Sequence, residues 1–301
     1  MEIKINNDPI NFTLENEKNL GDIIAGIEKW LGNSGYLVSS IERDGIPVVM
    51  DYDGEWKETS LDDIDLLEIT ILTGPEQYVT NLHTVYQYIS ILQRSIASGN
   101  GDSLNNLREE HQFVVENLDA LLGSPGYGAK LGSLLSASGA SDGELKPQVQ
   151  QLLTFCKNLS IILTGRIKEA TEPFEELKNA AKGLSELVPQ LMEVPVLLQT
   201  GKDKTAMGYV IEFTEYSDKL IRINHILKEQ GILDISGIIV DGRRFDEFFR
   251  DFNDILRELL EAFDSQDSVL IGDLLEYEIA PRVETLDLYM DEIEKSNIKE
   301  S

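Results

Sequence analysis

Histidine and cysteine are the side chains best suited to nucleophilic or metal chemistry, and this chain of 301 residues has three histidines and one cysteine. His83, His111 and His225 form no i, i+4 pair and no H-E-x-x-H site, the spacings that zinc enzymes use. The group Glu109-Glu110-His111 comes nearest to a ligand set, but a solvated helix face accounts for it better. Cys156 lies in an apolar helical run, which is typical of a buried, inert thiol.

Two other segments resemble ligand-binding loops. The stretch Gly126–Gly132 resembles a phosphate-binding glycine loop, but its spacing is one residue too long and no strand precedes it, so a linker is favoured. The stretch Asp51–Glu55 hints at a calcium loop, but an EF-hand needs regularly alternating oxygen ligands between two helices, so a turn is favoured. We therefore predict a protein that is not an enzyme, with no catalytic residue, no cofactor and no bound metal.

The charge of the chain restricts its partners. It carries 26 Lys and Arg against 54 Asp and Glu, a formal net charge of −28 at pH 7. Such a surface repels nucleic-acid phosphates and anionic membranes, and it favours docking to basic proteins. The chain has no run of about 18 apolar residues and does not start with a basic segment followed by an apolar one. We therefore expect a soluble cytoplasmic protein that binds neither nucleic acid nor membrane.

The first 73 residues have the pattern of a small α/β unit. Apolar residues alternate with polar ones on both sides of the turn Asn6–Pro9, which predicts a β-hairpin with Ile3, Ile5, Ile10, Phe12 and Leu14 on one face. Asn19 can cap a helix over residues 20–31, because its side-chain oxygen can accept hydrogen bonds from open amides. Further strands are predicted over 36–43, 47–50 and 66–72, with a turn at 51–54.

This order of elements, with the closing stretch SLDDIDLLEITIL, resembles the ubiquitin-like β-grasp fold over about residues 1–73. The resemblance implies a binding or docking module. Family members that modify proteins or carry sulfur end in a free Gly-Gly tail, whereas here Thr73-Gly74-Pro75 continues into the chain. The resemblance therefore implies no conjugation chemistry.

The rest of the chain is predicted to be helical, and it resembles only uncharacterised bacterial helical proteins. Apolar residues recur at steps of three and four in 78–96, 104–122, 149–167, 174–198, 205–227, 245–263 and 269–293. The segment 245–263 has a broad apolar stripe that needs a partner helix. We predict an α+β chain with a β-grasp-like domain at 1–74, a helical hairpin at 75–122, a flexible Gly/Ser-rich linker at 123–143 and a helical bundle at 144–301.

The predicted bundle has an internal echo at a spacing of 64 residues. The segment Asp203–Phe213 aligns with Asp267–Tyr277, each aspartate stands where a helix N-cap belongs, and Gly208 and Gly272 would let helices approach closely. A weaker third echo falls at 102–104. We interpret the copies as related helical hairpins, and we expect Pro281 to kink the last helix near residues 276–277.

Four residues in equivalent positions of the two copies are the candidate partner-binding site: Glu212, Phe213, Glu276 and Tyr277. The two glutamates could face a common groove and receive Lys or Arg from a partner. The alternative, which the sequence favours, is that they pair with neighbouring helices, for instance through Lys219 or Arg282.

The leading hypothesis is a non-enzymatic adaptor or scaffold that binds proteins with a basic or amphipathic surface. The second is an acidic export-type chaperone that holds a helical client in a groove. The third is an enzyme with a dispersed site, in which carboxylates meet His111 or His225 in a pocket.

Overall fold

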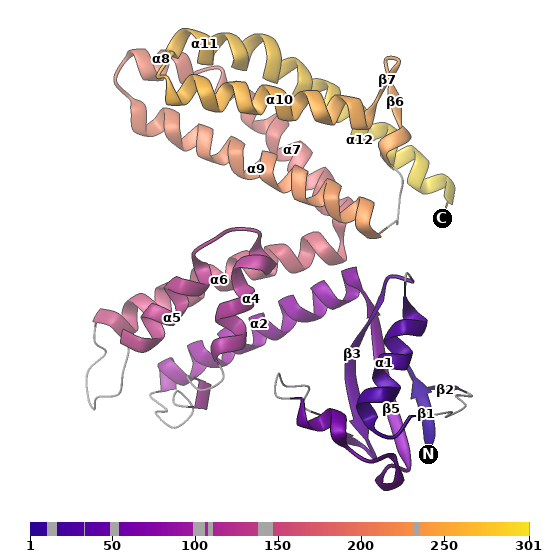
Figure 1. Cartoon of the computed structure of the whole chain (residues 1–301). Coiled ribbons are helices and arrows are strands. Elements are labelled where there is room, and N and C mark those ends of the chain that lie inside the picture. The colour runs from indigo at the N-terminus through magenta and orange to yellow at the C-terminus, as the bar shows by residue number, and fades with distance from the viewer. Residues whose placement is uncertain are drawn as a thin grey trace. The chain divides into compact units, whose positions relative to one another are not determined.

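A computed structural model describes residues 1–10, 17–32, 34–48, 54–98, 106–107, 111–137, 147–230 and 235–300 (Figure 1). A small mixed sheet is followed by a larger helical region, which confirms the predicted α+β class. The chain divides into two compact units, Met1–Ile167 and Lys168–Ser301. No helix in the described ranges has both the length and the hydropathy that a membrane span requires.

Five strands form the sheet of unit 1, in the order β2-β1-β5-β3-β4. The strand β1 is antiparallel to β2 and parallel to β5, and β3 is antiparallel to both β5 and β4. The predicted hairpin is confirmed as far as Ile10, whereas Phe12 and Leu14 lie outside the described residues. The strand bounds are Glu2–Ile5, Asp8–Ile10, Tyr36–Arg43, Ile46–Pro47 and Leu66–Thr73 for β1 to β5.

Helix α1 (Leu20–Leu31) supplies the helical side of the sheet's core. The side-chain oxygen of Asn19 accepts a hydrogen bond from the amide of Asp22 at 2.9 Å, so the predicted N-cap is confirmed. Two short 3-10 helices, η1 (Glu55–Glu58) and η2 (Leu61–Asp63), precede β5. The core shared by the helix and the sheet contains Ile3, Ile5, Leu20, Ile23, Ile24, Ile27, Ile41, Leu67, Ile69 and Ile71.

Strand β5 passes directly into helix α2 (Gly74–Ser98). The Glu76 carboxylate accepts hydrogen bonds from the Thr73 amide and hydroxyl, each at 2.8 Å, and the Thr73 hydroxyl oxygen accepts one from the Glu76 amide. This reciprocal pairing is a capping box, which satisfies open amides at the start of a helix. The Thr73-Gly74-Pro75 stretch is therefore a helix start.

In the described residues, unit 1 continues with α4 (His111–Leu122), α5 (Tyr127–Ala137) and most of α6 (Pro147–Thr171). Helix α5 occupies residues that the sequence analysis assigns to a flexible linker, so that prediction is corrected for 127–137, and 138–143 lie outside the described residues. Buried Leu131 and Leu135 order the segment. Gly128 allows α5 to pack closely on α4, because a Cβ there would overlap the carbonyl oxygen of Val115.

The division between the units falls inside α6 rather than at the predicted linker. Most of α6 packs within unit 1: the Gln93 side-chain amide donates to the Ser160 hydroxyl at 2.8 Å, and the Arg166 guanidinium donates to the carbonyl oxygen of Leu122 at 3.2 Å. Only the last turn of α6 belongs to unit 2, where the side-chain amide of Gln230 donates to the carbonyl oxygen of Ala170.

The long helices of unit 2 form a bundle, which Figure 1 shows. Helix α7 packs along α9 and α12, and α10 packs against α11 and a π-helical turn. The short helices α8 and α11 contact each other, and a two-stranded hairpin of β6 and β7 precedes α10. The bounds are α7 Pro173–Leu191, α8 Val194–Gln199, α9 Asp203–Gln230, η3 Ile235–Gly237, β6 Ile239–Val240, β7 Arg243–Arg244, α10 Phe245–Asp264, α11 Ser268–Asp273, the π-helical turn Leu274–Ile279 and α12 Ala280–Glu300.

The two copies of the echo each lie at the start of a helix, α9 for the first copy and α11 for the second. Asp267 is an N-cap whose carboxylate accepts from the amides of residues 269 and 270, as predicted, whereas Asp203 is the first residue of α9. A Cβ on Gly272 would lie 3.0 Å from Cγ of Pro195, so a close approach exists there. For Gly208 that prediction is wrong, because a Cβ there would meet open space. Residues 102–104 lie outside the described residues.

The last helix departs from α-helical geometry where a kink is predicted. The π-helical turn spans Leu274–Ile279 and ends two residues before Pro281. Proline has no amide hydrogen, so it cannot complete the α-helical ladder four residues upstream, and a wider turn accommodates the missing bond.

Candidate functional site

The four residues predicted to bind a partner lie in different environments of unit 2. Phe213 is 1% exposed and belongs to the core of the bundle. Glu212 is exposed on α9, and Glu276 and Tyr277 are exposed on the π-helical turn. A hydrogen bond to the Glu276 carboxylate raises the pKa of the Tyr277 hydroxyl. Of the four, only Phe213 lines the groove described below.

The ion pairs proposed for the two glutamates form with other partners. The Lys219 ammonium pairs with Glu176 of α7, and the Arg282 guanidinium pairs with Glu278, four residues earlier in the π-helical turn. From sequence alone, several carboxylates lie within reach of each cation. The packing of α7 on α9 selects Glu176 for Lys219, whereas Arg282 pairs locally with a carboxylate four residues before it.

A groove of about 390 Å³ lies between α9 and α10. Helix α9 packs against α7 and α8, and α10 packs against α11 and the π-helical turn, while residues of both helices line the groove. The lining residues are Val210, Phe213, Thr214, Ser217, Asp218 and Ile221 from α9, and Asn253, Leu256, Arg257, Leu259, Leu260 and Phe263 from α10.

The lining follows helical periodicity on both walls. On α9 the line Val210, Thr214, Ser217 and Ile221 advances by steps of four and three, and the exposed Met207 continues it by one step. On α10 the line is Asn253, Leu256, Leu260 and Phe263. Leu260 is 56% exposed and Ile221 is 36% exposed, so large apolar side chains of this groove face solvent.

Two polar groups lack hydrogen-bond partners in the groove. Ser217 is 2% exposed and its hydroxyl has no partner, and the buried side-chain oxygen of Asn253 also has none. Most buried polar atoms in proteins are paired, and an unpaired one costs about 1–3 kcal/mol. Both groups therefore have unused capacity to bind a donor that enters the groove.

The α10 wall is strongly acidic on its outer side. The helix carries seven acidic residues against two basic ones, and one of the two, Arg257, pairs with Asp254. The acidic residues of α10 are Asp246, Glu247, Asp251, Asp254, Glu258, Glu261 and Asp264.

Ser217, Asn253 and Leu260 are not among the site residues that the sequence predicts, although Leu260 belongs to the apolar stripe of residues 245–263. One feature of the sequence does point to an open apolar surface, because this stripe is wider than one partner helix can cover. Which part of it stays open depends on where α9 and α11 lie.

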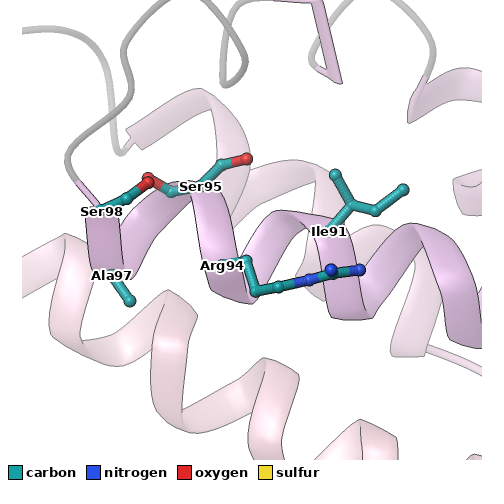
Figure 2. Close-up of a pocket in the computed structure, with 5 residues that line it drawn as sticks. All are labelled: Ile91, Arg94, Ser95, Ala97 and Ser98. Carbon is teal, nitrogen blue, oxygen red and sulfur yellow. The ribbon is translucent and has the colours of Figure 1, made fainter.

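Two other pockets lie outside this groove. One lies at the C-terminal end of α2, and Figure 2 shows its five described lining residues, all from that helix, with the Arg94 side chain running along the helix toward Ile91. The other, of about 360 Å³, lies between α1 and η1 beside Trp56. Neither is lined by a histidine or a cysteine in the described chain.

The candidate metal ligands and the cysteine also give no sign of a reactive site in the described residues. No group of three or more His, Cys, Asp or Glu side chains in the described ranges could hold a metal ion. His83 and His225 are exposed, and the carboxylates predicted beside His111 lie outside the described residues, as do Asp51 and Asp53 of the possible calcium loop. Cys156 is fully buried, and burial raises the pKa of its thiol to about 12.

The glycine segment that resembles a phosphate loop has its amides occupied. The Asp119 carboxylate accepts hydrogen bonds from the amide of Gly126 at 2.7 Å and from that of Gly128 at 2.8 Å. An internal carboxylate thus stands where a phosphate would have to bind.

Comparison with known proteins finds two family models that each match a part of the chain, and a relative that is similar over a longer stretch. Residues 1–73 match a family model described as the TP0873 N-terminal domain, and residues 175–288 match a domain of unknown function, DUF8042, which contains the whole groove. A protein of Treponema pallidum (strain Nichols), described as uncharacterized, is 27% identical over 198 residues, covering 64% of this chain and 96% of the relative. No solved structure matches.

Proposed function

We propose that the protein is a non-enzymatic cytoplasmic adaptor or scaffold that binds a partner protein in the groove between α9 and α10. The observation that carries this proposal is the open apolar lining, in which Leu260 and Ile221 face solvent beside a buried core. Exposed apolar side chains that gather in one groove mark interaction sites more often than scattered ones do.

We also infer that residues 1–73 are a ubiquitin-like β-grasp module that serves as a second docking element. Support comes from the strand order β2-β1-β5-β3-β4, from the parallel pairing of β1 with β5, and from α1 packed on the sheet. The direct passage from β5 into α2 leaves no free C-terminal tail for conjugation, which favours docking over covalent attachment.

Site-specific cross-linking in cells of the native organism tests the adaptor function. A photoreactive side chain replaces Leu260 in one variant and Leu288 in the control, because Leu288 is 48% exposed on α12 and does not line the groove. We expect one protein to be cross-linked in quantity from position 260 and not from position 288. The same set of proteins at both positions would contradict the proposal.

An export-type chaperone is the second candidate, and the groove favours it for the same reason. The two functions differ in what happens to the partner. A chaperone keeps its client soluble, so deleting the gene lowers the level of the cross-linked protein, whereas an adaptor's partner persists without it.

A further inference from the structure

The dimensions of the groove suit a helix. The line from Val210 to Ile221 covers eleven residue steps of α9, or about 16 Å at the rise of an α-helix. Two antiparallel helical walls with apolar residues at steps of three and four form the kind of surface onto which an amphipathic helix lays its apolar face. An extended peptide would find no open strand edge here, because both walls are helical.

The unpaired polar groups lie toward one end of the groove. Ser217 is one turn from Ile221 on α9, and Asn253 is the first lining residue of α10. The other end, formed by Val210, Leu260 and Phe263, is apolar. An entirely apolar ligand would leave the Ser217 hydroxyl and the Asn253 oxygen unpaired, whereas an amide or hydroxyl side chain could satisfy both.

The charge of the groove walls favours one sign of charge on the outer face of the ligand. Arg257 is already paired with Asp254, and the outer side of α10 carries Glu258 and Glu261 next to the lining residues. A helix with Lys and Arg on its flanks would find complementary charge there, and one with Glu and Asp would be repelled.

Resting on the proposed function, we infer that the occupant of the groove is an amphipathic helix of a partner protein, with a basic outer face and an Asn, Gln, Ser or Thr in its apolar stripe. That polar residue meets Ser217 and Asn253, and it sets the register and direction of the helix.

Selection from a display library tests this inference. The library consists of 18-residue peptides with a helical apolar pattern, in which the outer positions are Lys, Arg, Glu or Asp and the stripe positions are apolar, Asn, Gln, Ser or Thr. Selection uses the full chain, with counter-selection on Leu260→Glu, and Leu288→Glu as the matched control.

We expect the enriched peptides to have Lys and Arg outside and one polar residue in the stripe, and to bind the Leu288→Glu protein as they bind the wild type. Replacing that polar residue by Leu weakens binding to the wild type about tenfold, because hydrogen bonds to buried polar groups are lost, and Ser217→Ala protein distinguishes the two peptides less, because only the Asn253 oxygen remains to be paired. Enrichment of acidic or wholly apolar peptides, or no enrichment, would overturn the inference. If a partner is still cross-linked from position 260 in that case, the proposed function stands and only the nature of its ligand is wrong.

Discussion

The carboxylate of Asp119, near the end of α4, accepts a hydrogen bond from the amide of Gly128 at 2.8 Å, in the first turn of α5. Its second oxygen accepts from the amide of Gly126 at 2.7 Å. One side chain thus closes the turn between two helices and caps the second of them. These hydrogen bonds lower the pKa of the Asp119 carboxyl. The bond from the Gly128 amide has the larger effect, and the bond from the Gly126 amide has the smaller one.

Asp119→Asn should lower the melting temperature at pH 7. The asparagine side chain has one oxygen instead of two, so it can accept only one of the two hydrogen bonds in this geometry. A lowered pKa in the folded state means that the contact stabilises the fold above the ordinary pKa of 3.8 and loses this effect as the pH falls through the folded-state pKa. The difference in melting temperature between wild type and variant should therefore shrink below pH 4. A difference that stays constant with pH would contradict this assignment.

Gly128→Ala should destabilise the protein, because the new Cβ would overlap the backbone carbonyl of Val115, which cannot move without shifting α4. We expect a loss of about 1–3 kcal/mol in the free energy of unfolding. Gly165→Ala is the matched control on α6, where a Cβ meets nothing within 4 Å. It should stabilise the protein by about 0.5–1 kcal/mol, because alanine favours the helix. Urea denaturation measures both changes, and similar effects at the two positions would contradict the close packing.

Cys156 should be inert to thiol reagents in the native protein. Its thiol is fully buried and burial raises its pKa to about 12, so almost no thiolate exists at pH 8. We expect less than one tenth of the chains to react with a chromogenic disulfide in an hour at pH 8, and one thiol per chain to react at once in guanidinium chloride. Rapid labelling of the native protein would show that the core of unit 1 opens.

Arg222→Ala should destabilise unit 2 by about 1.5–3 kcal/mol, because hydrogen bonds to a buried charged group are lost. The Arg222 guanidinium donates to both oxygens of Glu169, each at 3.1 Å, and the Glu169 side chain is only 5% exposed. A double-mutant cycle with Glu169→Gln isolates the pair. Additive effects of the two changes would show that the pair contributes nothing of its own. The exposed pair of Lys182 and Glu186 is the control, and Lys182→Ala should change stability by less than about 0.5 kcal/mol.

Local patterns predicted several elements well. The alternation of Ile3 and Ile5 around the Asn6–Pro9 turn predicted a strand pair, and Asn19 predicted the start of α1, because such signals act within a few residues. The prediction of a linker over 127–137 is wrong for the same reason. Its glycines favour a linker when only near neighbours are considered, yet Gly128 lies where α5 contacts α4. Contact with a distant segment is not visible in a local pattern.

The candidate site shows the same limit. Glu212 and Glu276 hold equivalent positions in two copies of a segment, but equivalence along the chain does not bring side chains into one groove. Lys219 pairs with Glu176, a residue far from it in sequence, because α7 lies along α9.

The amino-acid sequence by itself determined the acidic charge, the α+β class and the broad apolar stripe of residues 245–263, since these follow from composition and periodicity. Only the tertiary structure decided which part of that stripe stays open. Leu260 is exposed and Phe252 is buried although both belong to the stripe, because Phe252 packs in the core of the bundle whereas Leu260 lines the open groove between α9 and α10. Burial depends on the neighbours a side chain finds in space, and no residue's own type specifies them.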